Sequence, residues 1–273
     1  KVGGECVFFV DGLRLDVAHQ LMGLLSEHEG SLTLSTQWSA LPSVTATGKA
    51  AVSPIAKQLV GLASDKDFQP SVIEEGTLSH DRFKRTLNKL GWQYLEEDEI
   101  GDPSSNAWTA CGDIDKEGHK SELKLPARIP RILDTIVDRV QELMQSGWQK
   151  IRIVTDHGWL LVPGTMPKSN LPAQAADSRW GRCAQLKANV NVEGLTLGWY
   201  WNANTAIHFP SGIHSFIAGR TYSHGGLSLQ ECLIPVISIE GKKKLLAQAS
   251  FSSLRWLGLT CKVEVDSKTD GLL

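Results

Sequence analysis

The sequence predicts an α/β fold, a sandwich with a mostly parallel central sheet and helices on both faces. An apolar run of strand length at 5–10 (ECVFFV) is followed by apolar residues at helical spacing over 14–27. The best amphipathic helix of the chain, at 127–146, leads directly into another strand at 150–155 (KIRIVT). Buried strands that alternate with helices in this way are typical of parallel sheets covered on both faces.

The segments between and after these units add further elements. Residues 31–36 (SLTLST) alternate like a second strand, and 41–60 begin as a loop that passes into a helix. Another helix is expected around 80–90. Residues 190–201 (VNVEGLTLGWYW) have strand patterning around a glycine, which favours a hairpin.

The end of the chain predicts a change of architecture. Residues 232–239 (CLIPVISI) form an expected strand, in which Pro235 favours an edge position or a strand start because proline lacks the N–H of a ladder. Three lysines at 242–244 mark a boundary. Beyond them, 254–265 (LRWLGLTCKVEV) have the pattern of a β-rich unit that is just beginning.

We therefore expect two parts, an α/β domain over 1–241 and a short C-terminal β extension over 242–273. A length of 273 residues fits one large α/β domain with such an addition. The chain starts at Lys1 rather than at a methionine and ends at Leu273 within the pattern of the extension. We interpret it as a domain taken from a longer protein.

Composition and charge exclude several classes of protein. Apolar residues make up 41% and charged residues 21%, which excludes a disordered or fibrous chain. The 28 basic and 30 acidic residues give a net charge of -2, which argues against a uniformly basic nucleic-acid binder. The apolar runs are far shorter than the roughly 20 residues of a membrane span, so no membrane association is expected.

The cysteines indicate a reducing compartment. The chain has 5 cysteines, an odd number, and none of them forms a CxxC pair. This excludes a disulfide framework and a structural cysteine zinc site. We therefore expect a cytoplasmic protein.

Aspartates and histidines form the motifs that carry chemistry. The sequence lacks GxSxG, GxGxxG and the P-loop, so hydrolases with a nucleophile elbow, Rossmann dehydrogenases and P-loop NTPases lose their usual support. Asp and His residues instead follow predicted strands or precede glycines, and carboxylates with imidazoles suit Zn²⁺, Mn²⁺ or Fe. The candidates are Asp11, Asp115 and His119 in D-K-E-G-H, Asp156 and His157 after the 150–155 strand, and His224 before Gly225 and Gly226.

Some positions have competitors in the sequence. Asp113 competes with Asp115, and the four-residue spacing to His119 favours Asp115. His208 and His214 compete with His224 for the late histidine.

The order of these motifs resembles the alkaline phosphatase superfamily. The matching segments are VDGLR (10–14), LPSVT (41–45), D-x₃-H (115–119), TDHG (155–158) and HGG (224–226). The segments VDGLRLDVA, LPSVTA and HGGLSLQECLIPVI resemble more narrowly the PglZ domain of bacterial phage-defence systems, namely BREX and phage growth limitation. This resemblance spans about 11–240. The sequence departs from the phosphodiesterase branch of the superfamily at one place, because residues 45–48 are Thr-Ala-Thr-Gly where that branch has Thr-Phe-Pro-Asn.

The resemblance implies a site for two divalent metal ions, for which zinc is favoured and manganese is the alternative. One ion would be held by Asp11, Asp156 and His157, and the other by Asp115, His119 and His224. Thr45 would lie against the metals and act as the nucleophile, with Thr47 and Ser43 as alternatives. Arg14 would neutralise a phosphate oxygen, unless it forms a surface ion pair instead.

The implied function is metal-dependent phosphoester hydrolysis in antiviral defence. A phosphodiester is the favoured substrate, with a nucleic acid as one candidate, and other defence-system proteins are expected partners. A two-metal site can stabilise both the attacking and the leaving oxygen of a phosphoryl displacement. The alternatives are a phosphomonoesterase or phosphotransferase with the same site, and a non-catalytic assembly platform within the defence complex.

Overall fold

A computed structural model describes residues 4–26, 30–241, 249–257 and 260–267 of the chain. Its centre is a 6-stranded sheet in which β15 runs antiparallel to its two neighbours and the other pairs are parallel. Across the sheet the strands are β2 (Ser31–Trp38), β15 (Leu233–Glu240), β8 (Lys150–Val154), β1 (Glu5–Phe9), β7 (Ala107–Ala110) and β6 (Gln93–Leu95). The predicted mostly parallel sheet is confirmed.

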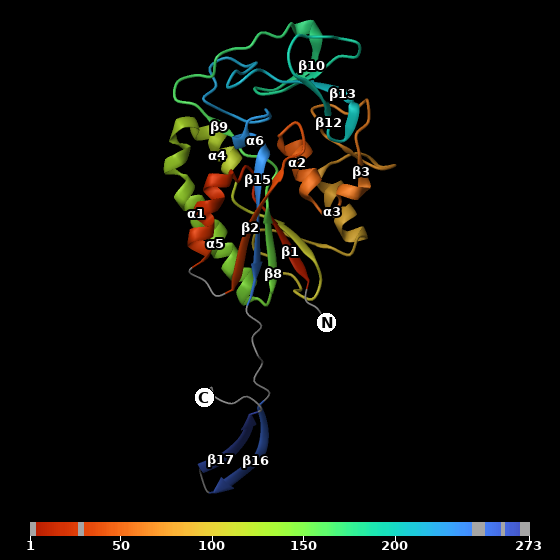
Figure 1. Cartoon of the computed structure of the whole chain (residues 1–273). Coiled ribbons are helices and arrows are strands. Elements are labelled where there is room, and N and C mark those ends of the chain that lie inside the picture. Colours follow the sequence, from red (N-terminus) through yellow and green to blue (C-terminus); the bar gives the residue numbers. More distant parts are fainter. Residues whose placement is uncertain (1–3, 27–29, 242–248, 258–259, 268–273) are drawn as a thin grey trace. The chain divides into compact units, whose positions relative to one another are not determined.

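Helices cover both faces of this sheet (Figure 1). Helices α1 (Leu15–Leu25) and α5 (Ile129–Gln145) pack on one face, and α2 (Thr45–Val52) and α3 (His80–Lys89) contribute to the core on the other. The side chains of β1 alternate between the two cores, Phe8 toward α1 and α5 and Phe9 toward α2 and α3. This alternation follows from the two-residue period of a strand and makes β1 the centre of the sandwich.

Helix α5 shows why the amphipathic pattern was informative. Its apolar residues recur every three or four positions, and Leu133, Ile136 and Leu143 are fully or almost fully buried. Gly147 follows the helix with φ of 106°, a left-handed conformation that glycine adopts at little cost. The chain then enters β8 directly, as the sequence predicted.

Two groups of shorter elements extend the sandwich. Between α2 and α3 lie η1 (Ala56–Gln58), β3 (Leu59–Val60), β4 (Ser71–Val72) and β5 (Gly76–Thr77). Between β7 and α5 lie α4 (Ile114–Ser121) and η2 (Glu122–Ala127).

A long insertion separates β8 from β15 and lies beyond the carboxyl ends of the central strands (Figure 1). Its 4-stranded antiparallel sheet contains β10 (Ala176–Arg179), β11 (Ala184–Leu186), β13 (Asn202–His208) and β12 (Thr196–Trp199), and η3 (Ala173–Ala175) precedes it. A hairpin forms here as β12 and β13, but its turn lies at residues 200–201 and not around the central glycine of 190–201, and residues 190–195 are not in a strand. The insertion ends with β14 (Tyr222–Ser223), which pairs with β9 (Leu160–Leu161), and with helix α6 (Leu229–Cys232).

Of the two positions expected for Pro235, the edge position is wrong, whereas the strand start fits because Pro235 is the third residue of β15. Strand β15 lies between β2 and β8 and pairs with both. Its pairing with β8 begins at Val236, so Pro235 lies in the portion that has only β2 beside it. A proline is tolerated there because the ladder on the β8 side has not yet started.

The chain divides into two compact units, Lys1–Gly241 and Lys242–Leu273. The second unit contains an antiparallel hairpin of β16 (Ala249–Leu257) and β17 (Thr260–Ser267). The lysines at 242–244 and residues 258–259 within the predicted 254–265 segment lie outside the described residues.

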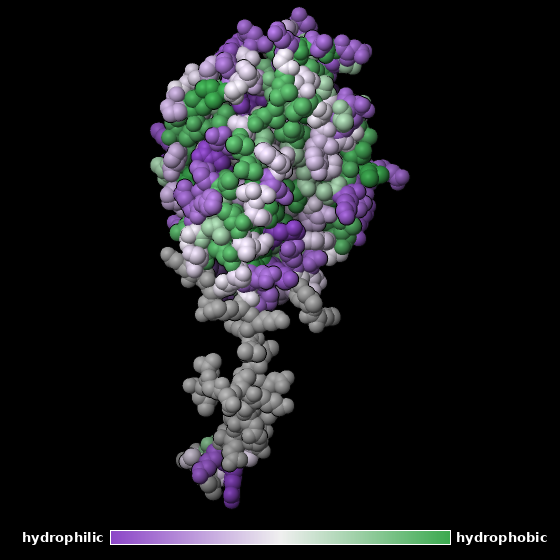
Figure 2. Space-filling model, in the orientation of Figure 1, coloured by the Kyte–Doolittle hydropathy of each residue, from purple (hydrophilic) through white to green (hydrophobic). Residues whose placement is uncertain are grey.

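Large apolar side chains are scattered on the surface of the first unit. On the face drawn in Figure 2, apolar and polar side chains are interspersed. Trp38 on the edge strand β2 is 69% exposed, whereas the tryptophans of the core are fully buried. In the part of the chain that the structure describes, no helix has the length and apolar character needed to cross a membrane.

We predict that two buried tryptophans differ in their sensitivity to phenylalanine. Trp108 and Trp148 are both 0% exposed, but only Trp148 has a hydrogen-bond acceptor for its indole, the carbonyl of Ile100 at 2.8 Å. Trp148→Phe should lower the free energy of unfolding by about 1 kcal/mol more than Trp108→Phe, because it alone loses a hydrogen bond. Urea unfolding measures the difference, and an equal or reversed order would contradict this account.

Candidate metal centre

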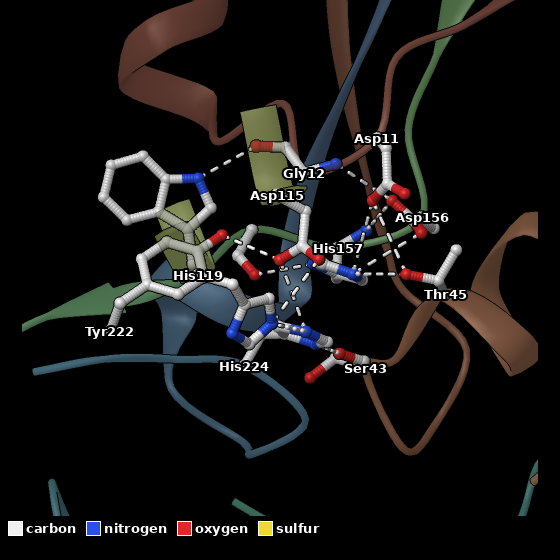
Figure 3. Close-up of polar contacts among 12 residues, drawn as sticks. Asp11, Gly12, Ser43, Thr45, Asp115, His119, Asp156, His157, Tyr222 and His224 are labelled. Carbon is white, nitrogen blue, oxygen red and sulfur yellow. Dashed lines mark hydrogen bonds and ion pairs between the residues drawn. The ribbon is translucent and has the colours of Figure 1, made fainter. Parts of the chain in front are cut away.

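The carboxyl ends of three adjacent strands bring the candidate ligands together. Asp11 follows β1, Asp156 and His157 follow β8, and Asp115 lies in α4 just after β7. In an open α/β sheet, this edge is where ligand sites form. The insertion adds His224, and α2 adds Thr45 as its first residue. Figure 3 shows these side chains converging on one region with that of His119.

The first group of ligand atoms belongs to Asp11, Asp156 and His157. One atom from each lies within 4.8 Å of the others. The Nε2 atom of His157 is 3.5 Å from Oδ2 of Asp156 and 3.7 Å from Oδ1 of Asp11. These are the three residues that the resemblance implied for the first metal ion.

Thr45 borders this first group. Its hydroxyl oxygen lies 3.2 Å from Nε2 of His157 and 3.5 Å from Oδ1 of Asp11. Helix α2 begins at Thr45, and the side chain of the N-cap residue Val44 makes no capping hydrogen bond. The hydroxyl therefore lies at an uncapped helix N-terminus, where backbone N–H groups favour anions.

The second group contains Asp115, His157 and His224, again with ligand atoms within 4.8 Å of one another. His119 is adjacent to it, because its Nε2 lies 3.2 Å from Nε2 of His224 and 3.5 Å from Oδ2 of Asp115. The resemblance implied Asp115, His119 and His224 as the ligands of the second ion. The structure brings these three together and adds that His157 lies between the two groups.

Backbone carbonyls orient two of the imidazoles. The Nδ1 atom of His157 lies 2.9 Å from the carbonyl oxygen of Gly158, and that of His224 lies 3.1 Å from the carbonyl oxygen of Ser43. A carbonyl only accepts, so each Nδ1 carries the hydrogen and each Nε2 keeps a lone pair that faces the cluster. The two rings stack with centroids 3.9 Å apart. Both imidazoles are thus oriented with Nε2 toward the cluster, the atom through which each could bind a metal.

Asp156 provides a direct test of whether these residues fit a metal. Its carboxylate is fully buried, and Oδ1 accepts hydrogen bonds from the N–H groups of Gly12 and His157. Its Oδ2 has no hydrogen-bond partner among the described residues. A buried carboxylate oxygen without a partner is costly unless a cation balances it. The donor set therefore fits a divalent ion.

The pKa shifts point to the same excess of negative charge. Burial, and then the neighbouring carboxylate of Asp156, raise the pKa of Asp11 well above its usual value. Burial alone would lower the pKa of His157, but Asp156, Asp115 and Asp11 together raise it. Burial, followed by the proximity of His157, lowers the pKa of His224 to about 4. The cluster thus favours any positive charge placed between its carboxylates.

Two residues that the sequence did not single out complete the site. Tyr222 donates a hydrogen bond of 2.8 Å to Oδ1 of Asp115. Gly118 allows this contact, because a Cβ there would lie 2.3 Å from the Tyr222 ring. The glycine of D-K-E-G-H was a signal for such close packing, whereas the sequence around Tyr222 contains no comparable signal.

Arg14 is not brought into the cluster. Its Nε and Nη2 atoms donate to the carboxylate of Asp16 at 2.6 Å each, and its guanidinium stacks 3.7 Å from the Trp159 ring centroid. The polar partners of Arg14 in the described structure are Asp16 and the carbonyl of Trp159. The structure thus gives Arg14 the ion pair that was its alternative role.

The competing hydroxyls are engaged elsewhere. The hydroxyl of Thr47 donates to the carbonyl of Phe68 at 3.0 Å and accepts from Nε1 of Trp199 at 2.9 Å. The hydroxyl of Ser43 donates to the carbonyl of Gly226 at 2.8 Å. Both side chains are fully buried, so Thr45 alone of the three presents its hydroxyl to the ligand groups.

The competing acid and histidines also lie outside the ligand groups. The side chain of Asp113 is 67% exposed and lies 3.6 Å from the ammonium of Lys116. His208 is 3.3 Å from the hydroxyl of Thr196, and His214 contacts the carbonyl of Ser211. The geometry therefore favours Asp115 and His224.

The sheet order, the helices on both faces and the ligand edge define an alkaline-phosphatase-like α/β fold. Comparisons of the sequence with protein-family models and with curated proteins find no match. Among solved structures, murine ectonucleotide pyrophosphatase/phosphodiesterase 5 is similar, with a TM-score of 0.54, 11% identity and 88% of each chain covered.

Two further solved structures have the same fold. An inactive threonine-to-alanine variant of the murine protein, in complex with AMP, has a TM-score of 0.54, 11% identity and coverage of 87% of this chain and 88% of that chain. The human protein has a TM-score of 0.51, 10% identity and 88% coverage of both chains. The neighbours are phosphodiesterases of the alkaline phosphatase superfamily, and the likeness shows the fold.

We predict that ligand variants lose metal. Asp156→Ala and His119→Ala should each reduce the bound zinc or manganese relative to the wild-type chain, because each removes a ligand atom from a different group. Asp113→Ala is the matched control and should keep the wild-type content. Elemental analysis of purified protein measures the content, and loss from Asp113→Ala alone would reject the assignment.

We also predict that metal stabilises the fold. Removal of metal with a chelator should lower the Tm of the wild-type chain by about 5–10 °C, because a cation offsets the repulsion of the buried carboxylates. Asp156→Ala should show a smaller shift under the same treatment. Thermal unfolding with and without chelator measures both, and equal shifts would contradict the role of Asp156.

Proposed function

We propose that the chain is a metal-dependent phosphoester hydrolase with Thr45 as its nucleophile, and that its substrate is a phosphodiester. The observation that carries the proposal is the position of the Thr45 hydroxyl. It lies 3.2 Å from His157 and 3.5 Å from Asp11, beside two groups of candidate metal ligands. Neighbours of the same fold are named as phosphodiesterases, which supports this reaction class.

Asp11, Asp156 and His157 would hold one metal ion, and Asp115, His119 and His224 the other. Zinc is favoured because imidazole nitrogens and carboxylates are its common ligands, and manganese is the alternative. When bound, the ions supply positive charge for the phosphate oxygens and lower the pKa of a nearby hydroxyl. Tyr222 holds the Asp115 carboxylate in place through its hydrogen bond.

The chain's own groups position the reacting atoms. The Thr45 oxygen attacks phosphorus, its proton leaves to solvent, and the bond from phosphorus to the leaving oxygen breaks. A phosphate bound at Thr45 would lie at the N-terminus of α2, where the N-cap residue Val44 makes no side-chain hydrogen bond. Water then cleaves the phosphothreonine and restores the hydroxyl. The inactivity of the threonine-to-alanine variant of the murine neighbour supports a threonine in this role.

The biological setting belongs to the same proposal. We infer that residues 1–241 form a PglZ-type domain of a phage-defence system, with 242–273 as a β-rich addition. The motifs after Asp11, around Thr45 and after His224 support this inference. The 5 free cysteines support a reducing, cytoplasmic setting, in which other defence proteins and a nucleic acid are candidate partners.

The first test measures hydrolysis of two small substrates by the chain after its zinc content has been determined. The substrates are methyl p-nitrophenyl phosphate, a diester, and p-nitrophenyl phosphate, a monoester. Faster turnover of the diester is expected. Faster turnover of the monoester would indicate a phosphomonoesterase instead of a diesterase. If the metal-loaded chain hydrolyses neither substrate, the hypothesis of a non-catalytic assembly platform is favoured.

We predict that Thr45→Ala abolishes diester hydrolysis while the metal content is retained. The loss should be at least about 10³-fold in kcat, because the two competing hydroxyls, those of Thr47 and Ser43, are buried and bonded elsewhere. Thr47→Ala is the matched control two residues along the helix, and its folded fraction should retain turnover. Wild-type turnover by Thr45→Ala would show that the nucleophile is another group.

A further inference from the structure

A cavity of about 340 Å³ opens beside Thr45 on the α2 and α3 side of the sheet. Its walls include Thr45 and Lys49 from α2, and His80, Phe83 and Tyr94 from α3 and β6. The cavity therefore joins the proposed nucleophile to a cation and to three rings. None of the proposed metal ligands lines it.

Lys49 is the cation of this cavity that has no ion-pair partner among the described residues. It lies four positions after Thr45, so both side chains emerge on the same face of α2. Its ammonium sits 4.8 Å from the centroid of the buried Phe9 ring. Burial raises the pKa of Asp11, and the charge of Lys49 is among those that oppose this rise.

The other lysines nearby are already neutralised. Lys84 forms an ion pair with Glu96, and Lys89 forms one with Glu75. Arg14, which was expected to contact phosphate, pairs with Asp16 instead. Lys49, in contrast, lines the cavity beside Thr45 and has no ion-pair partner among the described residues.

The rings form the apolar part of the cavity. His80 and Tyr94 meet edge to face with centroids 5.4 Å apart, and Phe83 meets Tyr94 in the same way at 6.4 Å. Phe83 is buried, whereas Tyr94 is partly and His80 largely exposed. Partly exposed rings next to a cation offer a planar aromatic group both stacking contact and apolar surface.

We propose that this cavity binds the organic group of the substrate and that Lys49 contacts its phosphate, in the role that the sequence assigned to Arg14. The inference rests on the proposed function and narrows the substrate class to phosphoesters of a nucleoside or a similar planar ring. The phosphate lies between Thr45 and Lys49, and the ring packs against Tyr94 and His80. The positively charged side chain of Lys49 thus adds to the charge that the metal ions would supply.

The test compares two ligands that differ only in the ring. AMP and ribose 5-phosphate share the phosphate and the sugar, and titration calorimetry measures their binding to the zinc-loaded chain without any turnover. We expect AMP to bind at least about tenfold more tightly, because stacking on aromatic side chains contributes on this scale. Equal affinities would overturn the assignment of the cavity to a ring.

Variants separate the ring contact from the phosphate contact. Tyr94→Leu should bring the ratio of the affinities for AMP and ribose 5-phosphate close to 1. Tyr94→Phe should keep the wild-type preference for AMP, because phenylalanine retains an aromatic ring. Lys49→Met should weaken both ligands by roughly tenfold or more, since a charge-assisted contact to phosphate is lost. Lys57→Met is the matched control, an exposed lysine outside the cavity, and should leave both affinities unchanged.

Folding and the proposed function are checked separately. Thermal unfolding and metal content identify any variant that fails to fold. If Tyr94→Leu fails to fold, His80→Ala removes the other exposed ring of the cavity and serves in its place, with the same expected loss of the preference for AMP. Absence of hydrolysis with an intact preference for AMP would reject the hydrolase but retain the cavity. Hydrolysis without that preference, or with affinities unaffected by Lys49→Met, would overturn the present inference alone.

Discussion

The concentration of buried carboxylates at one edge of the sheet is the constraint on which the rest of the structure depends. Asp156 is fully buried with one unpartnered oxygen, and Asp11 and Asp115 lie within reach of the same imidazole. Like charges in a poorly solvated cluster repel, so the arrangement requires cations and rigid support. The order β8-β1-β7 supplies that support, since three adjacent strands each lead directly to ligands.

The insertion between β8 and β15 completes the support from the opposite side. Arg182 and Glu231 form a buried ion pair, and Glu231 also accepts the N–H of Gly226 two residues after His224. A buried pair with its hydrogen bonds satisfied contributes little net stability, but it fixes geometry, because loss of either partner leaves an isolated charge. The loop that carries His224 is therefore held on one side by the pairing of β14 with β9 and on the other by these ionic contacts.

Sequence patterns predicted the features that depend on the spacing of apolar residues and on the order of motifs along the chain. Helix α5, strand β8 and the Asp156-His157 pair after it were recognisable because apolar spacing and polar strand ends are local signals. The ion pair of Arg14 with its near neighbour Asp16 was one of the two roles that the sequence left open. The central place of β15 and the support from Tyr222 were not recognisable. Each depends on which distant segments meet, and no pattern within one segment records a tertiary contact.

Helix α2 shows how several such contacts restrict one short segment. Its first residue presents the proposed nucleophile, and two residues later Thr47 binds the insertion through Trp199. A Cβ at Gly48 would lie 2.7 Å from Asp156, so only glycine lets the helix approach the ligand edge this closely. The Thr-Ala-Thr-Gly sequence thus meets packing demands that leave no position for the asparagine of the phosphodiesterase branch. Lys49, one residue further, lines the same cavity as Thr45, which is why we assign the phosphate contact of this helix to it.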